Sequence, residues 1–300
     1  MNADLHAHSY VSDGVLAPAE LVRRAFAHGV QLFALTDHDE IGGLDEARVA
    51  ATALGLVFVA GVEISVTWGG ETIHVVGLRI DPACSALREG LARTRSGRDQ
   101  RAREMGDDLA RVGIPDAYAG ALKYVGNPAM VGRTHFARYI VELGVCRDVQ
   151  EVFQRYLSEG KPGFIAHRWA DLGDALAWIR SAGGVAVLAL PGRYRLDETA
   201  LWALISAFRD AGGEGIEVVS GSHTRDQYQR FAQVAHEFDL RASRGSDFHG
   251  PDESRVELGS LPPLPGSLVP VWRDWPESAL VLARGGHPRS TTAKTGGARA

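Results

Sequence analysis

Two histidines close to the N-terminus are the first residues whose types and spacing could do chemistry. His6 and His8 are separated by one residue in DLHAHS. On a β-strand, where side chains alternate between the two faces, both imidazoles would lie on the same face and within reach of one cation. An HxH pair also occurs as hydrogen-bonded structure at polar strand ends, so the pair alone leaves both interpretations open.

Further carboxylates and imidazoles lie at or beside the ends of other predicted strands. They are Asp13, Asp37, His38, Asp39, Glu63, His74, Asp247 and His249. The carboxyl ends of parallel strands in α/β folds meet at one crevice, so these side chains should face one another. Imidazole and carboxylate without thiolate suit Mn²⁺, Zn²⁺ or Fe²⁺, and Glu63 could bridge two such ions. Carboxylates packed this closely would repel without cations, which favours a hydrolytic centre with several metals over structural polar groups.

The elements that must position these residues alternate between short β-rich runs and amphipathic helices. Strands are predicted at residues 4–8, 32–36, 57–64, 72–80, 164–167, 185–190, 215–219 and 240–246. The helices between them are predicted at residues 18–28, 43–54, 171–182, 197–211 and 224–238. This alternation is typical of βα units, and it predicts a parallel sheet or barrel.

One long segment interrupts the βα pattern. Residues 82–162 have mainly helical patterns and carry six arginines from Arg93 to Arg111, which we interpret as a solvated helix face, with guidance of RNA as the alternative. We therefore predict a barrel domain from residues 1–81 and 163–282, with residues 82–162 as a helical insertion. Residues 283–300 are rich in Gly, Ser, Thr, Lys and Arg without an apolar period, so a disordered tail is expected there.

Composition excludes several classes of protein. With 300 residues, 45% hydrophobic and 23% charged, the chain has the composition of an ordinary globular protein. The net charge of -5 argues against a dedicated binder of duplex DNA. The two cysteines, Cys84 and Cys146, form no CxxC motif, so neither a disulfide framework nor a thiolate zinc site is expected. No apolar stretch reaches the roughly 20 residues of a membrane span, and no secretory signal is visible, so we expect a cytoplasmic protein without a membrane partner.

The motifs DLHAHSYVSDG, LTDHDEIGG, GVEIS, IHVVGL and GSDFHG resemble the successive motifs of the PHP (polymerase and histidinol phosphatase) superfamily. Within it, the sequence is most similar to bacterial phosphoesterases that act as 3',5'-nucleoside bisphosphate phosphatases and as 5'-to-3' exoribonucleases on short RNA. The resemblance implies an α/β fold, a distorted (β/α)₇ barrel with the helical insertion. It also implies two to three divalent metals, usually Mn²⁺, with Zn²⁺, Fe²⁺ or Mg²⁺ as alternatives.

The resemblance also implies roles for individual residues. His6, His8, Glu63 and Asp247 would hold the first metal, Asp13, His74 and His249 another, and His38 the remaining one. Catalytic roles fall to Asp37, His38, Glu63 and Asp247. A second phosphate needs cations that do not bind metal, and the candidates are Arg133, His135, Lys161, His167 and Arg193.

One position departs from the family pattern. Where a histidine is expected in an AHPGR-like segment, this chain has Leu190. Three interpretations compete: an enzyme with two metals, a site completed by water or by His167 or His223, and a variant with weakened catalysis. The expected substrates are nucleoside 3',5'-bisphosphates and short 5'-phosphorylated RNA. The alternatives are another PHP phosphatase, acting for example on histidinol phosphate, and a catalytically weakened domain that binds nucleotide.

Overall fold

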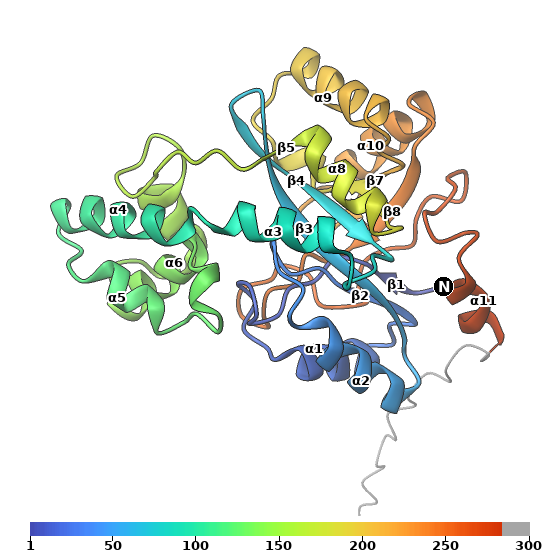
Figure 1. The fold of residues 1–300 in the computed structure, drawn as a ribbon, viewed down its shortest axis with the longest axis horizontal. Coiled ribbons are helices and arrows are strands. Elements are labelled where there is room, and N and C mark those ends of the chain that lie inside the picture. The colour runs from blue at the N-terminus through green and yellow to red at the C-terminus, as the bar shows by residue number, and fades with distance from the viewer. Residues whose placement is uncertain (284–300) are drawn as a thin grey trace, which may run out of the picture.

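A single curved sheet forms the centre of the molecule (Figure 1). The computed structural model describes residues 1–283, so the predicted tail lies outside the described residues except for Ala283. The strands along the main path of the sheet follow the order β1 (Ala3–Asp4), β2 (Leu32–Leu35), β3 (Val57–Trp68), β4 (Glu71–Leu78), β6 (Val185–Leu188), β7 (Gly215–Ser220) and β8 (Arg241–Gly245).

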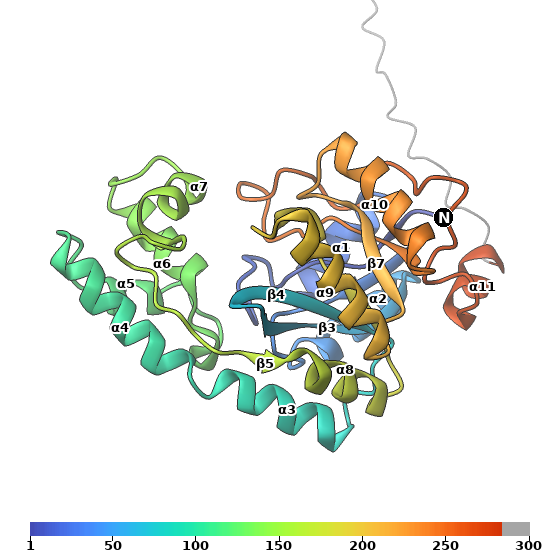
Figure 2. The same cartoon turned by 90° about the horizontal axis from the view of Figure 1, so that it is seen from above.

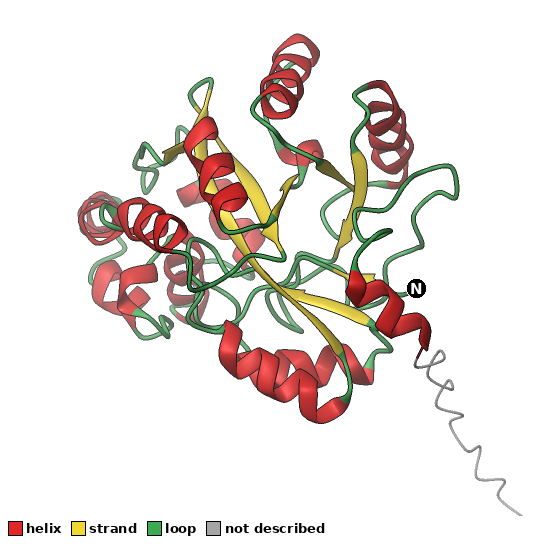
Figure 3. Ribbon diagram, turned by 45° about the vertical axis from the view of Figure 1, so that its right-hand side comes forward, coloured by secondary structure: helices red, strands yellow, loops and turns green. Residues whose placement is uncertain are grey.

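The first and last strands of this path meet and nearly close the sheet into a barrel. The Leu5 N–H donates to the Arg244 carbonyl at 3.0 Å, and Ala7 forms a parallel bridge with Phe248. Helices lie around the outside of the strands (Figure 3). The predicted α/β barrel is thereby confirmed, and residues from the two ends of the described chain become neighbours.

Strand β4 runs against the direction of its neighbours. It pairs antiparallel with both β3 and β6, whereas β1, β2, β3 and the β6 to β8 group pair in parallel. The reason is a tight hairpin at Gly69 and Gly70, whose φ angles of 58° and 87° suit a two-residue turn. His74 therefore lies within a strand, opposite Ser65, rather than at a carboxyl end.

The strand predicted at residues 164–167 is wrong. Residues 164–169 have no regular structure, and the short strand β5 (Ala170–Asp171) follows them and pairs with β3 beside the main path. Side chains take up the backbone groups that a neighbouring strand would otherwise pair with. Arg101 donates to the Ile165 carbonyl at 2.9 Å, and the Trp169 N–H donates to Thr67 Oγ1 at 2.8 Å.

The helices around the barrel agree closely with the predicted periodicity. In the first, Pro18 occupies the first turn, and Leu21, Val22 and Ala25 are buried on the predicted face. Among the described helices none is long and apolar enough to cross a membrane. The barrel helices are α1 (Pro18–Ala27), α2 (Leu44–Leu54), α8 (Leu172–Ser181), α9 (Glu198–Asp210), α10 (Arg225–Glu237) and α11 (Pro276–Ala283).

The helical insertion stands to one side of the barrel (Figure 2). Its elements are α3 (Ser85–Arg95), α4 (Arg98–Arg111), α5 (Ala117–Leu122), the short turn η1 (Pro128–Met130), α6 (Arg133–Glu142), α7 (Val149–Val152) and the π-helical turn η2 (Phe153–Leu157). From Ala102 to Leu157 the insertion has an apolar cluster of its own, whereas Leu87 and Leu91 of α3 join the main barrel core. Helix α3 thus packs on the barrel and carries α4 outward from it, and the boundaries at residues 82 and 162 stay a prediction.

Candidate active site

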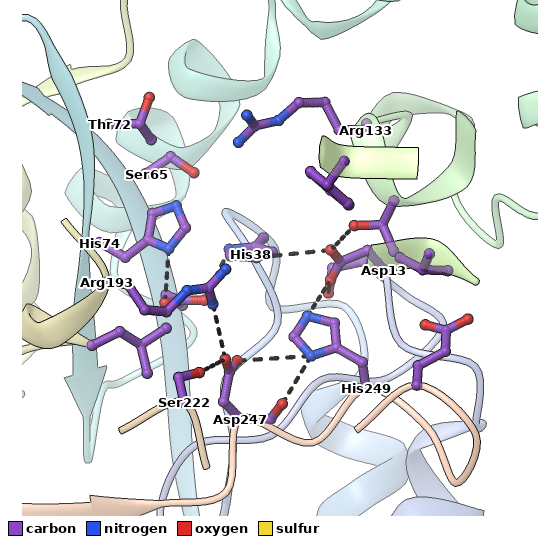
Figure 4. A pocket seen from close by; sticks show the side chains of 18 of the residues that line it. Asp13, His38, Ser65, Thr72, His74, Arg133, Arg193, Ser222, Asp247 and His249 are labelled. Atoms are coloured by element: carbon purple, nitrogen blue, oxygen red, sulfur yellow. Dashed lines mark hydrogen bonds and ion pairs between the residues drawn. The ribbon is translucent and has the colours of Figure 1, made fainter. Parts of the chain in front are cut away.

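A cavity of about 580 Å³ lies between the strand ends of the barrel and the insertion (Figure 4). The barrel contributes a wall of imidazoles and carboxylates, and the insertion contributes a wall of arginines together with Thr134 and Phe153. From the barrel the lining includes Asp13, His38, Glu63, His74, Leu190, Arg193, Asp247 and His249; from the insertion it includes Arg98, Arg101 and Arg133. The cavity therefore has two chemically different walls.

Glu63 is at the centre of the barrel wall. Its Oε2 lies 3.2 Å from His6 Nε2, 3.3 Å from His8 Nε2 and 2.9 Å from His38 Nδ1. Its Oε1 lies 3.1 Å from His74 Nδ1. One buried carboxylate thus faces four imidazoles that come from three different parts of the barrel.

The donor atoms of this wall fit divalent cations. Both oxygens of Glu63 are buried without a hydrogen-bond partner, and so are Nδ1 of His8 and Nδ1 of His38. In addition, His6 Nε2 and His8 Nε2 lie only 3.1 Å apart. Buried polar atoms are normally satisfied, and imidazole nitrogens and carboxylate oxygens that converge this closely suit a shared positive charge. The set of imidazole and carboxylate donors suits Mn²⁺, Zn²⁺ or Fe²⁺.

Three groups of side chains could each hold one ion. Every group places its donor atoms within 4.8 Å of one another. The groups are His6, His8 and Asp247; His8, Asp13, His38 and His249; and His38, Glu63 and His74. The grouping differs from the expected one for His74, which was assigned with Asp13 and His249. The hairpin places His74 beside Glu63 and His38, whereas Asp13 and His249 lie together with His38.

The electrostatics of the same residues favour positive charge. Burial alone would raise the pKa of Asp13, but the charges of His249 and His38 hold it well below its ordinary value. Burial likewise opposes charge on His249, yet Asp13 and Asp247 raise its pKa to about 9. Protons therefore neutralise the cluster when no cation is present, and a divalent cation would compete with them.

Asp37, for which a catalytic role was predicted, makes its hydrogen bonds with the loop at Ser9 and Ser12. It does not line the cavity. Its Oδ1 accepts hydrogen bonds from the Ser9 N–H at 2.8 Å and from Ser12 Oγ at 2.7 Å, and its Oδ2 accepts from Ser9 Oγ at 2.7 Å. These bonds occupy the carboxylate, so Asp37 fixes the loop that leads to Asp13 and does not reach the substrate space.

Only some of the five predicted phosphate-binding residues line the cavity. Arg133 and Arg193 line the cavity, whereas Lys161 and His167 do not, and Lys161 is exposed. His135 is fully buried, and its Nδ1 accepts from the Gly132 N–H at 3.1 Å. Burial lowers the pKa of His135 to about 4, so this imidazole is neutral at pH 7 and caps helix α6. The phosphate-binding role expected of His135 stays a prediction, and the observed contact of this imidazole is with the start of helix α6.

Two arginines that were expected to be solvated line the cavity instead. Arg98 and Arg101 are 8% and 7% exposed, and both guanidinium groups lie over the ring of Trp169, at 4.6 Å and 5.4 Å. Burial lowers the pKa of Arg101 to about 9 and that of Arg133 to about 10, each with help from neighbouring arginines. The i, i+3 spacing of Arg98 and Arg101 places them on one helix face, which was the available signal.

These buried arginines are incompletely neutralised. Arg98 pairs with Asp39, but within the described part of the chain no carboxylate lies within ion-pair distance of Arg101 or Arg133. Buried charges are normally paired, so the arginine wall (Arg98, Arg101 and Arg133) is suited to an anion that enters the cavity. Thr134 connects the two walls, because its hydroxyl donates to Asp13 Oδ2 at 3.0 Å.

Comparison with known proteins shows the family to which this chain belongs. The model of the PHP domain matches residues 4–119. The chain also aligns over nearly its whole length with characterised proteins that are well above 30% identical. The chain belongs to the PHP family, and the predicted membership is confirmed.

The particular relatives are bacterial phosphoesterases. A 3',5'-nucleoside bisphosphate phosphatase from Chromobacterium violaceum is 50% identical over 273 residues, which cover 91% of this chain and 96% of the relative. A 5'-3' exoribonuclease from Haemophilus influenzae is 45% identical and covers 90% of this chain and 97% of its own. Among solved structures, an amidohydrolase from Chromobacterium violaceum with bound sulfate superposes with a TM-score of 0.89 at 49% identity, covering 93% of this chain and 97% of its own.

Proposed function

We propose that this protein is a metal-dependent phosphoesterase that removes the 3'-phosphate of nucleoside 3',5'-bisphosphates and leaves the nucleoside 5'-monophosphate. We extend the proposal to short 5'-phosphorylated RNA, trimmed from its 5' end. The observation that carries the proposal is the pair of opposed walls in one cavity, Glu63 with its imidazoles on one side and the arginine wall on the other. The activities of the two relatives support the same substrates.

The barrel wall would take the phosphate that is hydrolysed. Divalent cations held there would lower the pKa of a bound water and offset the negative charge of the phosphoryl oxygens. Arg193 is the protein's own contribution beside these groups, since its Nη1 lies 3.1 Å from Asp247 Oδ2 and its side chain is half exposed to the cavity. It would orient the phosphoryl group by hydrogen bonds. We propose Mn²⁺ as the working metal, as the family resemblance implies, and the nitrogen and oxygen donors suit it as they suit Zn²⁺ and Fe²⁺.

The arginine wall would take the phosphate that is retained. Among residues 1–283 neither Arg101 nor Arg133 has a carboxylate partner. Arg101 lies over Trp169 and donates to the Ile165 carbonyl, and Arg133 lies over Phe153, so their remaining N–H groups are available to an anion. Charge-assisted hydrogen bonds from guanidinium groups to phosphate are among the strongest in proteins. A bisphosphate would then be held at both ends, which supports a preference for 3',5'-bisphosphates over simple monoesters. The sulfate bound by the solved relative is consistent with an anion site in this fold.

Leu190 bears on the number of cations. Its buried side chain lines the cavity and offers no donor atom. The group formed by His38, Glu63 and His74 also shares His38 with its neighbouring group. If each donor served one ion, His74 and one oxygen of Glu63 would be left without a third protein ligand. We therefore propose two firmly held cations and a third position that is incomplete in this chain.

The deciding experiment is phosphate release from adenosine 3',5'-bisphosphate by metal-stripped protein resupplied with Mn²⁺, measured beside Leu190→His. We expect the unmodified protein to release one phosphate and leave AMP, with two metals per chain by elemental analysis. Turnover by Leu190→His alone would mean a catalytically weakened chain. Binding of the nucleotide without turnover by either protein, or turnover of histidinol phosphate in its place, would overturn the substrate assignment.

A further inference from the structure

Glu217 is a buried carboxylate directly behind the barrel wall, the side of the cavity that carries Glu63 and its imidazoles. It lies on β7, is 1% exposed, and does not line the cavity. Its Oε1 lies 2.7 Å from His6 Nδ1, and its Oε2 accepts a hydrogen bond from the Leu190 N–H at 2.8 Å. Both oxygens are therefore used, one by an imidazole of the site and one by the backbone of the corner at Leu190.

The chemistry of these partners determines where the proton of His6 sits. A backbone N–H can only donate, so Oε2 must accept from Leu190. An ionised carboxylate has only acceptors, so Oε1 must also accept, and His6 Nδ1 must carry a hydrogen. The neutral ring then has its lone pair on Nε2. That nitrogen faces two carboxylates that line the cavity, 3.2 Å from Glu63 Oε2 and 3.7 Å from Asp247 Oδ1.

The same carboxylate also holds a conformation that leucine seldom adopts. Leu190 has a φ of 46°, in the left-handed region that non-glycine residues normally avoid. The hydrogen bond from its N–H to Glu217 helps to hold this turn. The end of β6 is thereby connected through Glu217 to the ring of His6 near the start of the chain.

We infer that Glu217 is a positioning residue that fixes the Nδ1–H form and the ring plane of His6, and that it couples His6 to the corner at Leu190. The inference rests on the proposed cation site and adds a residue that the sequence analysis did not identify. Carboxylates behind a metal-binding histidine act in this way in other proteins, and their loss typically costs about 10–100-fold in metal affinity. Glu217 keeps the Nε2 lone pair of His6 directed toward Glu63 and Asp247.

The first test is Glu217→Gln, which keeps the size of the side chain but replaces one acceptor by a donor. If its amide oxygen accepts from the Leu190 N–H, its NH₂ group faces His6 Nδ1. This favours the tautomer of His6 that has its hydrogen on Nε2. If the oxygen serves His6, the NH₂ group opposes the Leu190 N–H. Titration of the metal-stripped protein with Zn²⁺ should show binding about 10–100-fold weaker. Glu214→Gln, an exposed change just before β7, is the matched control and should leave Zn²⁺ binding unchanged.

A second comparison separates positioning from filling of space. Glu217→Asp keeps two acceptors on a shorter side chain and should bind Zn²⁺ more tightly than Glu217→Gln. A purely structural role predicts the opposite order, because Gln matches Glu in volume. Equal Zn²⁺ affinity of Glu217→Gln and the unmodified protein would overturn the inference. Because the readout is binding rather than turnover, its failure is distinct from failure of the proposed phosphatase activity.

A measurement on the unmodified protein makes the inference independent of whether the variants fold. In the Zn²⁺-loaded protein, which is diamagnetic, nitrogen NMR should show a slowly exchanging proton on Nδ1 of His6. Slow exchange is expected because the bond to Glu217 is fully buried. A proton on Nε2, or coordination through Nδ1, would contradict the inference whatever the variants do.

Discussion

Arg101 illustrates how one side chain can define a substrate. Its guanidinium is buried over Trp169 without a carboxylate partner, whereas Arg103, two residues later on the same helix, is exposed and paired with Asp99. We expect Arg101→Ala to lower kcat/KM for adenosine 3',5'-bisphosphate by about 10–100-fold, since a hydrogen bond to a charged group contributes about 1.5–3 kcal/mol. Hydrolysis of adenosine 3'-monophosphate should change little.

The matched control for this prediction is Arg103→Ala, which removes the same charge outside the cavity. It should leave both reactions within about twofold, because exposed ion pairs contribute at most about 1 kcal/mol. Steady-state kinetics with both substrates provide the measurement. An equal loss on the monophosphate would mean that Arg101 serves the reacting phosphate or the fold, and not the retained phosphate.

Asp37 gives a second prediction at the scale of single residues. The Asp37 carboxylate accepts three hydrogen bonds, from the Ser9 N–H, Ser9 Oγ and Ser12 Oγ. In Asp37→Asn the NH₂ group replaces one of the accepting oxygens, so at least one of these hydrogen bonds is lost. We expect the free energy of unfolding to fall by about 1–3 kcal/mol, measured by urea denaturation. Asp45→Asn, a change at an exposed position of α2, should be nearly neutral. Loss of turnover with unchanged stability would instead restore Asp37 to the catalytic role that the resemblance implied.

At the scale of elements, helix α3 determines where the arginine wall stands. Gly90 packs against Trp178 of α8, and an added Cβ would lie 2.3 Å from the indole ring. Gly90→Ala should therefore force the two helices apart and reduce stability by about 1–3 kcal/mol in denaturant unfolding. Gly173→Ala, in the first turn of α8 with open space around it, should be neutral or slightly stabilising. Equal free energies of unfolding for the two variants would show that this contact does not hold α3 on the barrel.

The same elements explain which parts of the fold the sequence could predict. Helices such as α1 follow from local periodicity, and so do strand β3, which contains Glu63, and strand β8, which Asp247 follows. The antiparallel direction of β4 depends on the tight hairpin at Gly69 and Gly70, and this direction places His74 within a strand. The loss of the strand at residues 164–167 depends on hydrogen bonds with distant side chains, which no local pattern encodes.

In the candidate site, too, some residues could be predicted from the sequence and others could not. His6, His8, Glu63, Asp247 and His249 could be found because their residue types are distinctive at strand ends. The role of Arg98 and Arg101 could not, because charged residues on a helix are usually solvated and only the packing of the insertion against the barrel buries these two. Glu217 lies inside an apolar strand pattern, where one carboxylate gives no sign of its partner.

At the scale of the whole molecule, metal binding at the barrel wall should stabilise the folded protein. The carboxylates of Asp13, Glu63 and Asp247 lie together in the barrel, and Thr134 links Asp13 to the insertion. We expect Mn²⁺ to raise the melting temperature of metal-stripped protein, since a ligand at 100 times its Kd stabilises by about 2.7 kcal/mol. Calorimetry with and without EDTA provides the measurement.

Glu63→Gln is the control for this prediction, because it keeps the side-chain volume but removes the shared charge. Its melting temperature should respond much less to Mn²⁺ than that of the unmodified protein. A shift of the same size in both proteins would place the stabilising ion elsewhere on the molecule, outside the three groups around Glu63.

The closure of the barrel between Ala7 and Phe248 has a consequence for how the protein comes into being. His6 and His249 are 243 residues apart in the sequence, so a growing chain exposes the first histidines long before the last ligands are synthesised. Pairing of strands so far apart in the sequence is slow, because the loop between them must close before the contact stabilises the fold. Before the final strand docks, the nascent chain offers a cation only part of a site, so tight capture of metal accompanies completion of the barrel.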